Sequence, residues 1–194
     1  MKLLLLTIFT FTLTSPKAQT LITPTQEFFT YFYSAQNKPD NKFIYKKGIN
    51  ANVIQQLAPR LDTLISWLFK DKMLQKVDTL ILTSEEKQHL VKALQNQSDT
   101  SQWNHIQFPN STEIALDSVT AILKDKTRGW DYIYKNYGRQ IYTIGLPIFF
   151  RNNQYCLYYY GKSCGESCSE SHFVLYKKVS GVWVKGTTIY EGYS

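Results

Sequence analysis

Residues 155–160, YCLYYY, and residues 172–179, HFVLYKKV, decide the fold of this chain of 194 residues. Both runs consist mainly of aromatic and aliphatic side chains, a composition that favours β-strands. The polar segment 161–171, GKSCGESCSES, separates them. We therefore predict two neighbouring antiparallel strands joined by a polar connection.

Shorter runs of the same kind lie on both sides of this pair. Asn152-Asn153 and Ser180-Gly181 separate neighbouring runs, and such dipeptides favour tight hairpin turns. Further strands are expected at residues 140–144, 146–150, 182–185 and 187–190. Together these runs predict an antiparallel β-meander over the last third of the chain.

Helix signals dominate the preceding part of the chain. Thr23 followed by Pro24 is a typical helix start, and Thr83 with Glu86 has the spacing of a capping box. A further helix is expected to begin at Ser111. These signals predict short helices that are each capped by a local side chain.

Apolar residues also recur at helical spacing over residues 51–70. Pro59 lies inside this stretch, where it removes a backbone donor, so we expect two short helices or one kinked helix. Residues 77–82 alternate like a strand, although the same residues also allow a helical extension. Trp103 is expected to fill the core from an irregular segment, and a helix around Trp130 is expected to end at Gly138.

The patterns predict an α+β fold. A mainly helical N-terminal two-thirds, residues 19–138, is expected to pack on a small C-terminal antiparallel β-meander, residues 139–194. The chain is 43% hydrophobic and 19% charged, which is typical of a globular protein and excludes a disordered one. Its length favours one α+β domain, residues 19–194.

The first 18 residues have the pattern of a secretory signal peptide. Lys2 precedes an apolar run, residues 3–14, which is shorter than the roughly 20 residues that span a membrane. Ser15-Pro16-Lys17-Ala18 then supplies a helix breaker and a small residue for cleavage. We predict a secreted or periplasmic protein with no transmembrane segment in its mature chain.

Positive charge is concentrated in the C-terminal part of the chain. Residues 19–123 contain ten basic and ten acidic residues, whereas residues 124–194 contain ten basic and five acidic ones. Eleven of the fourteen tyrosines lie in the same basic part. Since aromatic rings beside cations can stack on sugars, we predict a binding face on the sheet. Its residues are Tyr158, Tyr160, Tyr176, Lys177, Lys178 and Lys185.

Two of the three cysteines lie close together in the polar connection. Cys164 and Cys168 are four residues apart, and in an exported protein such neighbours usually form a disulfide. Cys156 is then left as a buried thiol. Pairing of Cys156 with either of the other two stays an alternative. No cofactor and no metal site is predicted, although Cys164, Cys168 and His172 with a glutamate would be a candidate zinc set.

The C-terminal part resembles a group of uncharacterised exported bacterial proteins. The resemblance covers residues 127–194 and rests on a PIF strand, a CG-x-x-C loop and an LYKK-x-x-G-x-W hairpin. In this chain these are residues 147–149, 164–168 and 175–183. Ser169-Glu170-Ser171 departs from the group, in which a glycine usually follows the second cysteine. The resemblance supports the fold and the export, and it carries over no catalytic residue.

These observations predict a non-enzymatic binding or accessory module of the cell envelope. Its expected partner is an anionic glycan or another envelope component, since an exported protein rarely meets nucleic acid. The alternative is a small hydrolase that acts on a cell-envelope or extracellular glycan. Its candidate residues are Glu166, Glu170 and His172, because glycoside hydrolysis uses paired carboxyl groups. Enzymatic activity is the less favoured of the two.

Overall fold

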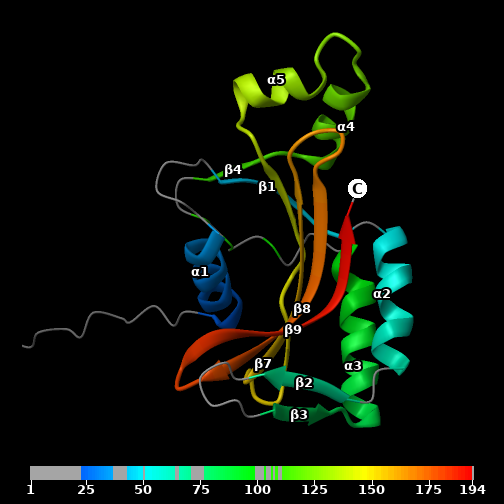
Figure 1. Ribbon diagram of the computed structural model, residues 1–194, viewed down its shortest axis with the longest axis vertical. Coiled ribbons are helices and arrows are strands. Elements are labelled where there is room, and N and C mark those ends of the chain that lie inside the picture. Colours follow the sequence, from blue (N-terminus) through cyan, green and yellow to red (C-terminus); the bar gives the residue numbers. More distant parts are fainter. Residues whose placement is uncertain are drawn as a thin grey trace, which may run out of the picture.

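A computed structural model describes residues 23–36, 43–49, 51–63, 66–70, 77–98, 103, 106, 108 and 111–193. The predicted signal peptide lies outside these residues. The helices are α1 (Pro24–Gln36), α2 (Ala51–Thr63), α3 (Ser84–Gln95), the 3-10 turn η1 (Asn96–Ser98), α4 (Leu116–Lys124) and α5 (Gly129–Asn136) (Figure 1). The strands are β1 (Phe43–Lys47), β2 (Ser66–Lys70), β3 (Val77–Ile81), β4 (Ser111–Glu113), β5 (Ile141–Ile144), β6 (Ile148–Phe150), β7 (Tyr155–Ser163), β8 (Ser169–Val179) and β9 (Val182–Tyr193).

Seven strands form the main sheet, in the order β4-β1-β5-β7-β8-β9, with β6 paired to one end of β7. Strands β5, β7, β8 and β9 are antiparallel neighbours, which confirms the predicted C-terminal meander and the α+β class. Strand β1 is parallel to both β4 and β5, so the sheet is mixed. The N-terminal two-thirds is therefore less purely helical than predicted, because it supplies two strands to this sheet.

Two expected helices are wrong in part. Residues 66–70 form β2, which pairs with β3, so the helix that begins at Ala51 ends at Thr63 and contains Pro59. Ser111 lies in β4 and does not cap a helix, and its hydroxyl donates a hydrogen bond to the carbonyl of Phe108 at 2.6 Å. In both places strand pairing outweighs the local helical pattern.

The cap at Thr83, the hairpin turn at Ser180-Gly181 and the helix end near Gly138 are confirmed. The backbone N–H of Glu86 donates to the Thr83 hydroxyl, and the Glu86 carboxylate accepts from the Thr83 N–H. Ser180 and Gly181 have φ values of 50° and 83°, which the hairpin between β8 and β9 requires. Gly138 has a φ of 147° just after α5, where a residue with a side chain would be strained.

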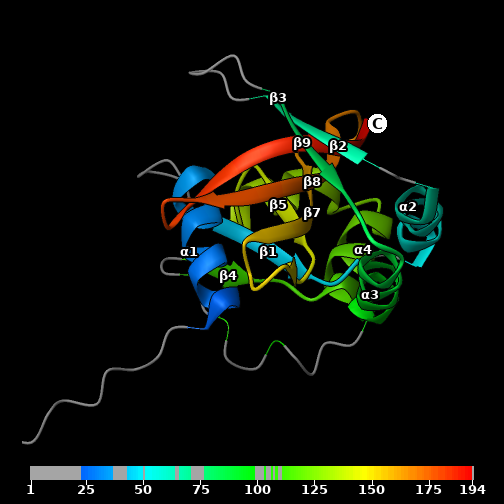
Figure 2. The same cartoon turned by 90° about the horizontal axis from the view of Figure 1, so that it is seen from below.

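Helices cover both faces of the sheet. Figure 2 shows α1 on one side and α2 with α3 on the other. Side chains alternate between the two faces along each strand. Tyr158 of β7 and Tyr176 of β8 pack with Phe28 of α1, whereas Leu157 and Leu175 pack with α2 and α3. The sheet therefore has one aromatic core and one aliphatic core.

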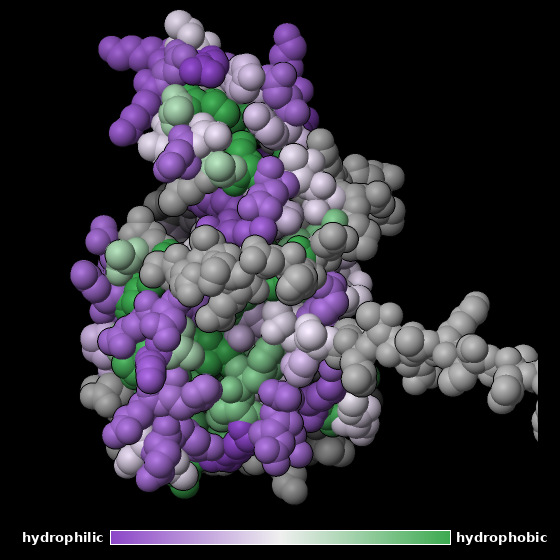
Figure 3. All heavy atoms as spheres, turned by 180° about the vertical axis from the view of Figure 1, so that it is seen from behind, coloured by the Kyte–Doolittle hydropathy of each residue, from purple (hydrophilic) through white to green (hydrophobic). Residues whose placement is uncertain are grey.

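Helices α4 and α5 form a separate cap at one end of the sheet. They pack through Val119, Ile122 and Ile133 against Ile44 of β1 and Ile141 of β5. Figure 3 shows hydrophilic side chains over this end of the molecule. No helix in the described part of the chain is long and apolar enough to cross a membrane.

Candidate functional site

The tyrosines of the predicted binding face lie in the core. Tyr158, Tyr160 and Tyr176 are at most 7% exposed. Tyr158 lies against the rings of Phe28 and Phe32, with ring centroids 4.9 and 4.8 Å apart. Because α1 covers these rings, they cannot stack on a ligand at the surface. This part of the prediction is corrected.

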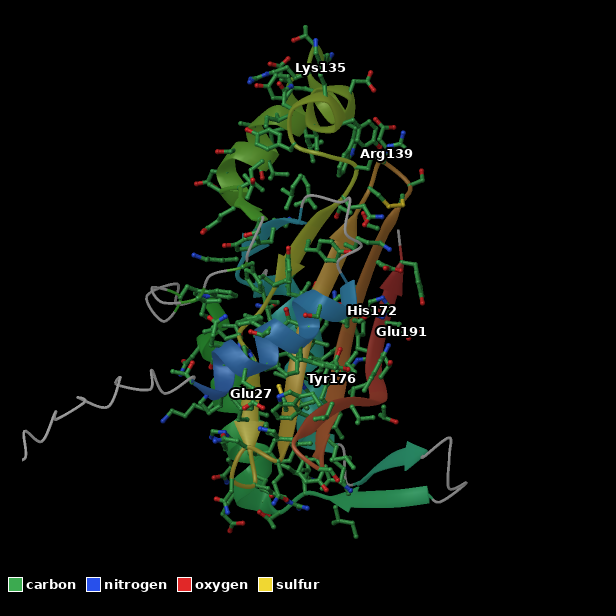
Figure 4. All side chains as sticks on the ribbon, turned by 90° about the vertical axis from the view of Figure 1, so that its left-hand side faces the viewer. Glu27, Lys135, Arg139, His172, Tyr176 and Glu191 are labelled. Atoms are coloured by element: carbon green, nitrogen blue, oxygen red, sulfur yellow. A yellow bond between two sulfur atoms is a disulfide. The ribbon has the colours of Figure 1, made fainter. Side chains whose placement is uncertain are left out.

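The three lysines of that face differ in their surroundings. Lys178 forms an ion pair with Glu27 of α1 and lies over the ring of Trp183, at 5.5 Å from its centroid. Lys177 lies over the ring of Tyr155 at 5.8 Å. Lys185 is exposed. In Figure 4, Tyr176 lies behind α1, the helix that carries Glu27. The six predicted residues therefore do not form one aromatic and basic surface.

The polar connection between β7 and β8 is closed by the predicted cysteine pair. Cys164 and Cys168 lie at disulfide distance, with their Cα atoms 5.1 Å apart, and Cys156 is a free, buried thiol. The Tyr134 hydroxyl of α5 donates a hydrogen bond to the Cys164 carbonyl at 2.7 Å. The disulfide loop, residues 164–168, is therefore held both by its own crosslink and by the α4–α5 cap.

Next to this loop, the side chains on the α1 side of the sheet change from aromatic to charged. Lys162 of β7, Glu170 of β8 and Tyr193 of β9 are paired in register. One step closer to the core, Tyr160, His172 and Glu191 form the next row. We call this part of the three strands the open end of the sheet. Strand alternation places both rows on the same face as the aromatic core.

Lys162 and Glu170 form the ion pair at the centre of the open end. The Lys162 Nζ atom lies 2.7 Å from Glu170 Oε1. This hydrogen bond from Lys162 holds the pKa of the Glu170 carboxyl below its usual range. Glu170 is therefore ionised at neutral pH, and it can accept hydrogen bonds but cannot act as a general acid.

His172 lies between two carboxylates. Its Nε2 atom is 3.7 Å from Glu170 Oε2, and its Nδ1 atom is 3.8 Å from Glu191 Oε1. The ring is stacked on Tyr160 with centroids 4.9 Å apart, and His172 is only 8% exposed. Figure 4 shows His172 and Glu191 on neighbouring strands. The Tyr193 hydroxyl donates to Glu191 Oε2 at 3.1 Å, which joins the two rows.

A cavity of about 420 Å³ opens beside the ion pair. The residues that line this charged cavity are Lys162, Cys164, Ser167, Cys168, Ser169, Glu170 and Tyr193. Tyr193 is 71% exposed, so its ring is available at the rim. The site thus combines an ammonium, a carboxylate, hydroxyls and one accessible aromatic ring, a set that can hydrogen-bond and stack on a polar ligand.

The structure brings together two of the three candidate residues for hydrolysis. Glu170 and His172 are neighbours, whereas Glu166 is exposed in the disulfide loop and makes no ion pair with His172 in the described part of the chain. Among the described residues, no group of three or more histidine, cysteine, aspartate or glutamate side chains is placed to hold a metal ion.

Sequence reasoning missed Lys162, Glu191 and Tyr193 as site residues. Lys162 follows Tyr158 and Tyr160 at alternate positions of β7, and this change from aromatic to charged was the available signal. The alternate positions before Glu191 and Tyr193 include Thr187 and Lys185, so β9 gives no such signal. Their meeting depends on the register of three strands, which the sequence pattern leaves undetermined. A comparison with protein-family models, curated proteins and solved structures finds no match for this chain.

Proposed function

We propose that this protein is an exported, non-enzymatic binding module of the cell envelope whose ligand site is the charged cavity. The expected ligand is an anionic glycan or a related envelope component. The observation that carries the proposal is the cavity itself, where the Lys162–Glu170 ion pair lies beside the exposed ring of Tyr193. The signal-like residues 1–18 and the cysteine pair support export.

The chemistry of the cavity suits a sugar. Carboxylates and ammonium groups hydrogen-bond to hydroxyls, and an exposed tyrosine ring stacks on the apolar face of a pyranose. The excess of basic residues in the C-terminal part of the chain attracts an anionic polymer before contact. Part of this attraction is screened by salt, so affinity should fall as ionic strength rises.

A small glycan hydrolase is the second candidate, favoured by the meeting of Glu170 and His172 at the same cavity. The lowered pKa of Glu170 suits the base or nucleophile of a glycosidase and not its acid, and among the described residues the lining of the charged cavity contains no second carboxyl group for the acid role. Turnover of an envelope glycan that is lost in Glu170→Gln would favour the hydrolase over the binding module.

The test of the proposed function compares two lysines. The mature chain, residues 19–194, is titrated with an acidic oligosaccharide and with soluble peptidoglycan fragments at low and high salt. We expect Lys162→Gln to weaken binding about tenfold, equivalent to about 1.4 kcal/mol, and Tyr193→Ala to weaken it as well. Lys185→Gln is the matched control, because Lys185 is an exposed lysine of the originally predicted face.

Two results would contradict the proposal. One is unchanged affinity in Lys162→Gln together with a loss in Lys185→Gln, which would return the site to the other end of the sheet. The other is the absence of binding to any of these glycans at low salt.

A further inference from the structure

The opposite face of the open end has a different chemistry. On that face, the α4–α5 cap packs on Ile44 and Ile141, and the α2–α3 layer packs on Tyr159 and Phe173. Between these two apolar layers lies one row of small or polar residues. It runs across five strands through Lys46, Thr143, Gly161, Ser171 and Gly192.

The two glycines of this row have no side chains, so at these positions the surface of the sheet is formed by the backbone itself. A Cβ atom on Gly192 would lie 2.6 Å from the Tyr190 hydroxyl and 2.7 Å from Ser171 Oγ. One on Gly161 would lie 3.3 Å from the Glu170 carbonyl and 3.5 Å from the Tyr159 hydroxyl. Side chains at these positions would displace the hydroxyl groups that now converge there.

A cavity of about 280 Å³ lies over this row, close to the lower limit of about 300 Å³ for small-molecule sites. We call it the polar trough. Its lining residues are Thr143, Tyr159, Gly161, Lys162, Ser163, Ser169, Glu170, Ser171, Tyr190, Gly192 and Tyr193. Four of them, Lys162, Ser169, Glu170 and Tyr193, also line the charged cavity, since both lie at the ends of the same strands.

Hydroxyl groups converge at the centre of the trough. Tyr159 of β7 shares a hydrogen bond with Ser171 of β8. The Tyr190 hydroxyl of β9 and the Ser171 hydroxyl both lie next to the Cα atom of Gly192. Arg60 of α2 lies over the Tyr190 ring at 5.2 Å from its centroid. The phenols are therefore held in place, and each hydroxyl can both donate and accept a hydrogen bond. This is the pairing that a sugar hydroxyl requires.

Lys46 adds a positive charge at the β1 end of the row. It is paired in register with Thr143, and alternation places it on the same face. Lys46 is half-buried, and within the part of the chain that the structure describes it has no ion pair. Burial lowers the pKa of its ammonium group. A partly buried cation without an anionic partner is unfavourable, and a bound carboxylate would relieve this cost.

We propose that the polar trough is a second ligand site that binds an acidic saccharide. Hydroxyls of the sugar contact Ser171 and Tyr190. Its carboxylate extends past Thr143 toward Lys46, which is paired in register with Thr143 but does not itself line the trough. Ser171 and Tyr190 line the trough but not the charged cavity, so variants of these two residues test the trough separately from the function proposed for that cavity.

The experiment titrates the mature chain with D-glucuronate and, separately, with D-glucose, followed by NMR chemical shifts. We expect glucuronate to bind more tightly than glucose. Ser171→Ala and Tyr190→Phe should each weaken the binding of both sugars about tenfold. Lys46→Gln should weaken the binding of glucuronate alone, which removes the preference. Ser167→Ala is the control, because Ser167 lines only the charged cavity.

The results that would contradict a ligand site in the trough differ from those that would contradict a ligand site in the charged cavity. No shift with glucuronate, or unchanged binding in both Ser171→Ala and Lys46→Gln, removes the trough as a site. If Ser167→Ala is the only variant that loses glucuronate binding, the monosaccharide binds in the charged cavity and not in the trough. Circular dichroism of each variant separates a lost ligand contact from a lost fold.

Discussion

The two ends of strands β7, β8 and β9 differ in what covers them and in what they display. At one end Leu157, Tyr158, Leu175 and Tyr176 are buried between α1 on one face and α2 with α3 on the other. At the open end the same strands continue with lysine, glutamate, serine and glycine beside two cavities. Strand pairing is continuous along β7 and β8 from the packed end to the open end.

The comparison shows why an aromatic-rich strand is a poor guide to a binding surface. The sequence predicts Tyr158, Tyr160 and Tyr176 on a binding face of the sheet. In the structure, Tyr158, Tyr160 and Tyr176 all face α1, and Phe28 contacts two of them, with ring centroids 4.9 Å from Tyr158 and 5.1 Å from Tyr176. These aromatic side chains therefore belong to the core beneath α1 and are not available at the surface.

The largest expected effect on stability comes from removing a buried ring at the packed end. Phe28→Ala removes a fully buried ring, and we expect it to lower the free energy of unfolding by about 3–5 kcal/mol. Tyr193→Ala is the matched control at the open end, where the ring is 71% exposed, and it should leave stability unchanged. Urea denaturation of both variants measures the difference. Equal losses would mean that the two ends do not differ in their contribution to the fold.

A smaller loss is expected at the buried amide of Gln97, which joins η1 to the connection between β5 and β6. Its Nε2 donates to the Leu146 carbonyl at 3.0 Å, and its Oε1 accepts from the Leu146 N–H at 2.6 Å. Gln97→Ala leaves both backbone groups unpaired, so we expect a loss of about 2–3 kcal/mol. Gln88→Ala, on the exposed side of α3, is the control. A Gln97 variant as stable as the control would contradict this role.

The smallest expected effect on stability is one that depends on pH. Arg151 donates two hydrogen bonds to Glu86, at 2.6 and 2.9 Å, and chiefly through this contact the pKa of the Glu86 carboxyl is lowered. Stability from a lowered carboxyl pKa is present above its unfolded value, about 4.3, and is lost as pH falls through the folded value.

Glu86→Gln should therefore cost about 1 kcal/mol at pH 7, because Arg151 is partly exposed and solvent weakens the pair. The difference from the unmodified chain should shrink below about pH 4. Glu166→Gln, with an exposed carboxyl in the disulfide loop, is the control and should not change stability at pH 7. A difference between Glu86→Gln and the unmodified chain that stays constant from pH 7 to pH 3 would contradict the assignment.

Local signals in the sequence predicted much of the fold. Thr83 with Glu86, Ser180 with Gly181, and the alternating runs from Tyr155 onward each specify their structure through contacts within a few residues. The parallel pairing of β1 with β4 and β5 could not be predicted, because the paired residues are 68 and 97 positions apart in the sequence. For β4 the local pattern even favoured a helix.

The candidate site was predicted less well than the fold. Cys164, Cys168, Glu170 and His172 were singled out, but their partners Lys162, Glu191 and Tyr193 come together only through strand register. Tyr158 is buried because α1 covers it, and residue spacing on the strand does not reveal this tertiary contact.

The most direct test of the central claim is an NMR titration of isotope-labelled residues 19–194 with an acidic oligosaccharide. If the open end is the binding region, backbone shifts will be concentrated in residues 162–171 and 190–193, and they will weaken as salt is added. Shifts that are confined to Lys177, Lys178 and Lys185 would contradict the account and return the binding surface to the packed end.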